Sequence, residues 1–194
     1  MLSHPNVSTA GDACGIWHRL VIVYQQAFLR WSIKTASDPD ASRIRLGPVD
    51  TTVGELRSLP TPAGLARNTP RQDPVEFTVY RVRARLVEYH EEGDQDFHVI
   101  IAEPNDPSQT MIAEIPDPAC PGASSSKLGP TLLRTVRQNF IGLFGQPPTK
   151  EGFRLVPGHP VVLVIGVGFF DKLHGQRGVA PNGIELHPVL DVRR

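Results

Sequence analysis

Apolar and polar residues alternate after Pro74, with the period of two that is typical of a half-buried β-strand. The apolar members are Tyr80, Val82, Ala84 and Leu86, and Arg81, Arg83 and Arg85 lie between them. A polar turn at 90–94 leads to a second apolar segment at 97–101, and a turn at 104–108 leads to a third at 111–115. The pattern therefore predicts three strands, the second and third of which form a hairpin.

The spacing of apolar residues then becomes helical. Leu133, Val136 and Phe140 recur at the period of an α-helix, and Gly145 is placed to end it. The apolar run 161–170 predicts a buried strand, because it has only about half of the roughly 20 residues that a membrane helix needs. A last alternating strand is expected over 184–190.

Three strands, a helix and two further strands follow one another in the order of the oligonucleotide/oligosaccharide-binding (OB) fold. In that fold the helix lies between strands three and four of a five-stranded barrel. Other small folds share this set of elements, but the position of the helix favours the OB type. We therefore predict a mainly β protein with an OB-type barrel over residues 76–194.

The chain before the predicted barrel divides into two parts. Residues 1–29 show no persuasive period, so we expect an N-terminal segment that is partly disordered. Residues 30–75 are rich in proline and glycine and are expected to form an arm that packs on the barrel. Within this arm, the segment from Arg30 to Asp40 is predicted to be extended and then to turn at Ser37–Asp40. A short helix is predicted after Asp50 or Thr51 as N-cap.

The charge balance, the N-terminal segment and the cysteines each narrow the functional classes that the chain could belong to. Lysine plus arginine and aspartate plus glutamate both number 20, so the chain has no overall attraction to nucleic acid or to an anionic membrane. We recognise no signal-peptide core, which indicates a cytoplasmic protein unless the export signal is missing from this chain. Cys14 and Cys120 share no metal-binding spacing, and whether they pair with each other stays open.

The C-terminal third carries three distinctive segments, Gly166–Asp171 (GVGFFD), His174–Gln176 (HGQ) and Gly178–Val189 (GVAPNGIELHPV). With these segments the chain resembles an uncharacterised family of bacterial proteins, and the resemblance covers most of residues 30–192. It implies an OB-like fold. It implies no known activity, so the catalytic residues are unknown and whether the protein is an enzyme stays open. Members often look exported or fused to other domains.

Polar residues gather in the two loops that flank the usual ligand surface of an OB barrel, here 90–96 and 171–183. Our first interpretation is a non-catalytic binding or interaction module that uses these loops. The candidate ligand-binding residues are Asp96, His98, Asp171, His174, Gln176, Arg177 and Asn182.

A divalent metal is the possible cofactor. Glu185 and His187 are two residues apart on a strand, so their side chains share one face at about 6 to 7 Å. With Asp171 or His174 they could form a mixed oxygen and nitrogen site for zinc or manganese. The structural alternative is that His174 and His187 bond loop backbone and that Glu185 pairs with Arg177 or an arginine of the first strand.

A bound ion would also allow a second function, that of a metal-dependent hydrolase or nuclease acting on a phosphodiester. Asp96 or His98 would then act as acid or base. Single-stranded nucleic acid is a possible partner, because Arg81, Arg83 and Arg85 form a row. The acidic loop and the zero net charge disfavour it, and the alternative is that the arginines pair with nearby glutamates such as Glu88, Glu103 and Glu114.

Overall fold

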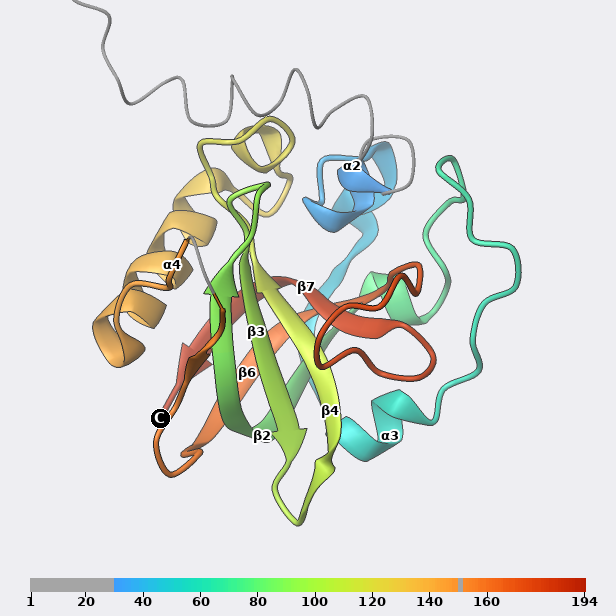
Figure 1. The fold of residues 1–194 in the computed structure, drawn as a ribbon. Helices are drawn as coiled ribbons and strands as arrows, with labels where there is room; N and C mark the ends of the chain where they lie inside the picture. The colour runs from blue at the N-terminus through green and yellow to red at the C-terminus, as the bar shows by residue number, and fades with distance from the viewer. Residues whose placement is uncertain (1–29, 150–151) are drawn as a thin grey trace, which may run out of the picture.

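The computed structural model describes residues 30–149 and 152–194 (Figure 1). The N-terminal segment 1–29, with its expected partial disorder, lies outside the described residues. The helices and 3-10 turns are α2 (Trp31–Lys34), η1 (Pro39–Arg43), α3 (Val53–Arg57), η2 (Val75–Phe77), η3 (Ala123–Ser125) and α4 (Pro130–Phe144). The strands are β1 (Arg45–Thr51), β2 (Thr78–Glu91), β3 (Phe97–Glu103), β4 (Asp106–Ile115), β5 (Arg154–Leu155), β6 (Val161–Phe170) and β7 (Ile184–Arg193).

The strands form one mixed sheet in the order β1-β2-β3-β4-β7-β6, and β6 also pairs with β2. The strands β2, β3, β4, β7 and β6 therefore close into a ring. Pairing in the ring is antiparallel except between β4 and β7, which run parallel. The prediction of a mainly β fold, with a helix between the third and fourth strands of the ring in chain order, is confirmed.

The main core forms where alternate residues of the ring strands meet. Phe97, Val99 and Ile101 of β3 belong to it, as do Ile184 and Leu186 of β7. Helix α4 covers one side of the ring (Figure 1) and adds Val136 and Phe140 to the core. Burial of each such side chain stabilises the fold by about 1.5–3 kcal/mol.

Residues 30–75 differ from the prediction in three details. The segment after Arg30 was expected to be extended, and this is wrong, because Trp31–Lys34 form a helical turn. The turn expected at Ser37–Asp40 is present, since Asp38 caps the 3-10 turn η1. The N-cap of α3 is Thr52, not Asp50 or Thr51, because Thr52 and Glu55 form a reciprocal capping box. Strand β1 was not predicted, since its residues are largely exposed and show no alternating burial.

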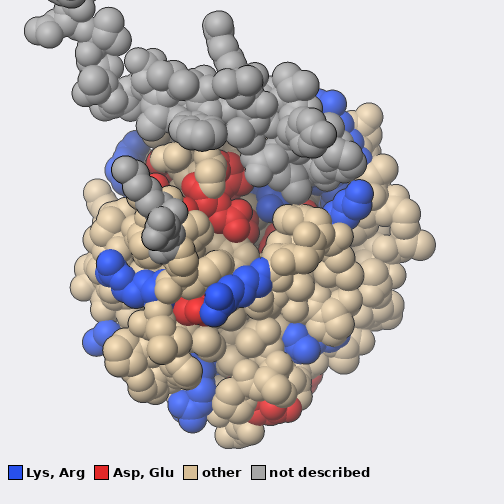
Figure 2. Space-filling model, viewed as in Figure 1, with Lys and Arg blue, Asp and Glu red and all other residues tan. Residues whose placement is uncertain are grey.

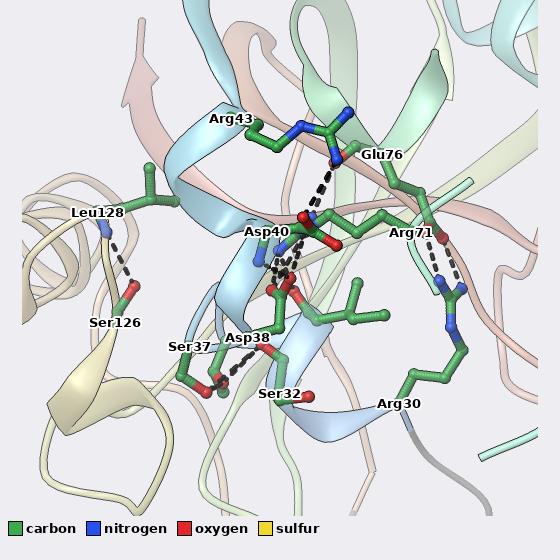
Figure 3. Close-up of polar contacts among 12 residues, drawn as sticks. Arg30, Ser32, Ser37, Asp38, Asp40, Arg43, Arg71, Glu76, Ser126 and Leu128 are labelled. Atoms are coloured by element: carbon green, nitrogen blue, oxygen red, sulfur yellow. Dashed lines mark hydrogen bonds and ion pairs between the residues drawn. The ribbon is translucent and has the colours of Figure 1, made fainter. Parts of the chain in front are cut away.

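Two buried ion pairs fix residues 30–75, one of them within the segment and the other to Glu76 beside the ring (Figure 3). Arg30 donates to both carboxylate oxygens of Glu76 at 2.7 and 2.5 Å, and Arg71 donates to Asp38. Glu76 also accepts a hydrogen bond from the backbone N–H of Phe170 at 2.9 Å. Helix α2 is thereby fixed next to the end of β6. The predicted arm also adds Val53 and Leu56 to the main core.

Candidate metal centre

Charged side chains gather on the outer face of three adjacent strands, β3, β4 and β7. His98 lies opposite Glu114 in the β3–β4 pairing, and Glu185 lies opposite Ile112 in the β4–β7 pairing. The sequence neighbours of these charged residues belong to the main core. Because successive side chains of a strand point to opposite faces, the charged residues face away from that core.

We call this group the outer-face cluster. It consists of Lys34 from α2, Glu92, Asp94 and Asp96 from the β2–β3 connection, His98, Glu114, Asp171 after β6, and Glu185 and His187 of β7. Asp and Glu side chains gather in the upper part of the face shown in Figure 2, the end at which the β2–β3 turn and α2 lie in Figure 1. His187 and Glu185 are only 0% and 2% exposed. The β7 side of the cluster is therefore buried, whereas Glu92, at its edge, is 38% exposed.

Glu114 lies at the centre of the cluster, because its two oxygens face different partners. Oε1 is 3.4 Å from Nδ1 of His98. Oε2 is 3.1 Å from Nδ1 of His187 and 3.4 Å from Nζ of Lys34. The carboxylate thus links two imidazoles that come from strands on either side of β4.

The ring of His98 has a fixed orientation. Its Nε2 lies 2.9 Å from the backbone carbonyl oxygen of Arg177, so this nitrogen carries the proton and donates it. Its Nδ1 faces carboxylates, with Oε1 of Glu92 at 3.0 Å. The loop 171–183 therefore sets which nitrogen of His98 is directed into the cluster.

His187 lies between two carboxylates. Its Nε2 is 3.3 Å from Oδ2 of Asp96, and its Nδ1 is 3.1 Å from Oε2 of Glu114. Asp96 is itself oriented by the backbone N–H of Asp117, which donates to Oδ1 at 3.2 Å. A bulge helps to place His187, since Gly166 and Gly168 of β6 pair with Val189 and Leu186, so that β7 has one extra residue there.

Lys34 lies on the side of the cluster where Asp171 and Glu185 meet Glu114. Its Nζ is 3.6 Å from Oδ2 of Asp171 and 3.7 Å from Oε1 of Glu185, besides its contact with Glu114. Burial by itself lowers the pKa of a lysine, but these three carboxylates raise the pKa of Lys34 well above its ordinary value. Lys34 is therefore a permanent cation of the site.

The histidines hold protons strongly when no metal competes for them. Burial lowers the pKa of each ring, but Glu114 and Glu92 raise the pKa of His98 to about 10. Asp96 and Glu114 likewise raise the pKa of His187 to about 9. Burial would raise the pKa of Glu114, but Lys34, His187 and His98 together hold it well below its ordinary value.

The raised pKa values of two other carboxyl groups reflect the excess of negative charge in the cluster. Burial, followed by the charges of Asp96 and Glu114, raises the pKa of Asp94 to about 8. Burial is also the main cause that raises the pKa of Glu185, and Glu114 and Asp171 add to it. The cluster therefore has more anionic groups than its fixed cation can balance.

Several of the short contacts lack the direction of a hydrogen bond. Among the described residues, no hydrogen-bond partner meets Oδ2 of Asp96, Nδ1 of His98, Oε1 of Glu185 or either ring nitrogen of His187. Buried polar atoms are normally hydrogen-bonded, and exceptions need a physical explanation. Metal ligands provide one, because ligand atoms converge on a common point rather than on one another.

Two groups of residues within the described chain could each hold a metal ion. One consists of Glu92, His98 and Glu114, and the other of Asp96, Glu114 and His187. In each group the ligand atoms lie within 4.8 Å of one another. Carboxylate oxygen and imidazole nitrogen are donors that suit zinc and manganese.

The four metal ligands predicted from the sequence are only partly brought together. Glu185 and Asp171 both contact Lys34, and His187 lies 4.0 Å from Glu185. His174 contacts Asp171 at 3.7 Å, but its side chain is 56% exposed. Neither three-residue group contains Asp171, His174 or Glu185.

Sequence reasoning missed Glu92 and Glu114 as ligands, and it assigned Asp96 and His98 the role of acid or base rather than that of metal ligand. Glu114 was considered only as a partner of the arginine row. The register of the predicted hairpin is the signal that could have found it, because this register places Glu114 opposite His98. Glu92 contacts His98 from the turn end of β2, where no periodic pattern indicates the direction of a side chain.

The remaining loop candidates hold the loop in place. Arg177 pairs with Glu88 at 2.6 Å, so its expected pairing with Glu185 is wrong. Asn182 donates to the carbonyl oxygens of Leu56 and Leu59, and Gln176 donates to Asp171 and Lys172. In the arginine row, Arg81 pairs with Asp50 and Arg85 donates to backbone carbonyls, not to the glutamates expected.

Comparison with family models, with curated proteins and with solved structures found no match for this chain. No helix in the described ranges is long and apolar enough to cross a membrane. The question whether Cys120 pairs with Cys14 involves a residue, Cys14, that lies outside the described residues.

Proposed function

We propose that residues 76–194 form an OB-type domain whose function is to bind a divalent metal ion in the outer-face cluster. The order of the ring strands and the position of α4 between β4 and β6 support the OB assignment. The cluster lies on β3 and β4, which are the second and third strands of the ring in chain order. It is flanked by the loops 90–96 and 171–183. OB folds generally bind their ligands in this region.

One observation carries the metal proposal. Glu114 approaches Nδ1 of both His98 and His187, and these buried nitrogens have no hydrogen-bond partner. A structural ion pair would be expected to align its N–H with an oxygen, because a buried polar group without a partner costs about 1–3 kcal/mol. A metal ion would satisfy both the nitrogens and the carboxylate.

The spacing of the ligand atoms fits this proposal. Metal bonds of about 2.0 to 2.1 Å place neighbouring ligand atoms about 2.9 Å apart at octahedral angles and about 3.3 Å apart at tetrahedral angles. The contacts of His98 Nδ1 with Glu92 and Glu114 are 3.0 and 3.4 Å, and that of His187 Nδ1 with Glu114 is 3.1 Å. Only small movements would therefore be needed to accept an ion.

Metal analysis of the purified protein tests the proposal. After incubation with Zn²⁺ or Mn²⁺ and removal of excess ion, the chain is expected to retain at least one ion and to show a higher Tm than the chelator-treated protein. Glu114→Gln keeps the shape of the side chain and removes its charge, and we expect at least tenfold weaker binding. His174→Ala is the control, because it removes an exposed ring outside both groups. No retained ion and no shift of Tm in the wild type would overturn the proposal.

A metal-dependent hydrolase acting on a phosphodiester is the alternative. The same ion would supply the Lewis acid that such chemistry needs. Burial weighs against it, because His98 and His187 are 1% and 0% exposed and a polymer would have to reach them. Assays with bis(p-nitrophenyl) phosphate and with single-stranded DNA separate the two functions: turnover that is lost in Glu114→Gln would favour the hydrolase.

A further inference from the structure

We propose that the outer-face cluster holds two divalent cations, which share Glu114 as a bridging carboxylate. This inference rests on the proposed metal-binding function and deepens it. The first ion would lie among Glu92, His98 and Glu114, and the second among Asp96, Glu114 and His187. Zinc and manganese are the ions that the donor atoms suit.

The division of ligands between the two groups is the first argument. Glu114 belongs to both groups, and each of the other ligands belongs to one. Its Oε1 faces His98 and its Oε2 faces His187. A carboxylate whose two oxygens face two sets of ligands can bridge two ions at the separation of about 3.5–4 Å seen in two-metal sites.

The hydrogen bond made by the other ring nitrogen of His98 is the second argument. Metal-binding histidines usually donate the proton of the other ring nitrogen to a carbonyl or a carboxylate, which fixes the ring. Nε2 of His98 has such a partner in the carbonyl oxygen of Arg177. Its Nδ1 is therefore free of the proton when a metal binds, and it points to Glu92 and Glu114.

Lys34 limits the number of ions. Its ammonium group already lies within 4 Å of Glu114, Asp171 and Glu185. These three carboxylates could otherwise form a further cation site. Lys34 occupies the space between these carboxylates, so the described part of the cluster offers places for two ions and not for three.

Charge balance supports two ions rather than one. The cluster contains six carboxyl groups, which are Glu92, Asp94, Asp96, Glu114, Asp171 and Glu185. Once metal binding has displaced the protons of the two histidines, Asp94 and Glu185, the cluster with Lys34 included has an excess of five negative charges. One divalent ion would leave an excess of three, and two would leave an excess of one. Buried charges that are not balanced are costly, so the second ion has a strong electrostatic reason to bind.

Titration of the metal-free protein with Mn²⁺, followed by metal analysis and electron paramagnetic resonance, tests this inference. We expect two ions per wild-type chain and a loss of the isolated-Mn²⁺ signal as the second ion binds, because neighbouring ions couple magnetically. His98→Ala and His187→Ala are each expected to retain one ion with an uncoupled spectrum. His174→Ala should keep both ions and the coupling.

The outcomes separate this inference from the function on which it rests. One uncoupled ion in the wild type would overturn the bridged pair and leave the metal-binding function standing. No ion at all would overturn both. Circular dichroism of each variant before titration identifies a variant that fails to fold, and the wild-type stoichiometry decides the question without any variant.

Discussion

His98 on β3 and Glu114 on β4 lie directly opposite each other, with Nδ1 of the histidine 3.4 Å from Oε1 of the glutamate. Opposed side chains of a strand pair are close enough to interact. This pair connects the β3–β4 hairpin to β7, because the second oxygen of Glu114 reaches His187. The register of one hairpin thus places Glu114 beside His98, and the pairing of β4 with β7 brings its second oxygen to His187.

Removal of the charge of Glu114 is expected to destabilise the metal-free protein. Glu114→Gln leaves Lys34, His98 and His187 without their common anion, and breaking a buried ion pair costs about 3–5 kcal/mol. Urea denaturation in the presence of a chelator measures this loss. Asp40→Asn is the matched control, because Asp40 pairs with Arg43 on the surface with its side chain 48% exposed. A change of only about 0.5 kcal/mol is expected there. Equal effects of the two substitutions would contradict the central position of Glu114.

The stability of the metal-free protein is expected to decrease with pH above neutrality. The pKa values of His98 and His187 are raised to about 10 and about 9, so their stabilisation is fully present below the unfolded value of about 6.5. It is lost as pH rises through about 9 to 10. Asp94 acts in the same direction, because its pKa is raised to about 8.

Denaturation midpoints at several pH values between 6.5 and 10, with a chelator present, measure this decrease. His174→Ala should show the same slope as the wild type, since its ring lies outside both ligand groups. The double variant His98→Gln and His187→Gln should show a flatter profile. A wild-type midpoint that is constant or rises over this range would be inconsistent with the protonated state assigned to the two histidines.

The Arg30–Glu76 pair is expected to be strongly coupled. Both side chains are almost fully buried, at 4% and 0% exposure. Arg30→Met should cost about 3–5 kcal/mol, because it leaves the Glu76 carboxylate buried without its cation. Adding Glu76→Gln should then cost less than it does in the wild type, with a coupling energy of about 0.5–3 kcal/mol. A double-mutant cycle by urea denaturation measures the coupling, and strictly additive effects would argue against it.

Gly178 is expected to be intolerant of a side chain. It has a φ of +79°, and an added Cβ would lie 2.7 Å from the side chain of Ile100. Gly175 is the matched control, because its φ is +88° and nothing lies within 4 Å of its Cβ position. Both alanine variants store backbone strain, but only Gly178→Ala also overpacks the loop against β3, which adds about 1–3 kcal/mol. Thermal denaturation compares the two, and equal shifts of Tm would show that the loop does not rest on Ile100.

Much of the fold could be predicted because it depends on local patterns. Alternation along 80–86, the helical spacing from Leu133 to Phe140 and the apolar run 161–170 each record which side of an element faces the core. The structure has elements at all three places, in the predicted order. Helix α2 was not predicted, because four residues do not form a stable helix alone. Tertiary contacts of Arg30 and Lys34 hold it in place.

For the candidate site, too, some features follow from the sequence alone and others only from the tertiary structure. The sequence determined that Glu185 and His187 share one face of a strand and that polar residues gather in the loops 90–96 and 171–183. Only the tertiary structure decided which of these residues meet, because β7 is brought beside the β3–β4 hairpin by pairing between segments that are distant in sequence. That pairing placed Glu114 between His98 and His187 and directed Arg177 to Glu88. The position of a charge on its own strand is a local property, whereas its partner across the sheet is set by register and topology.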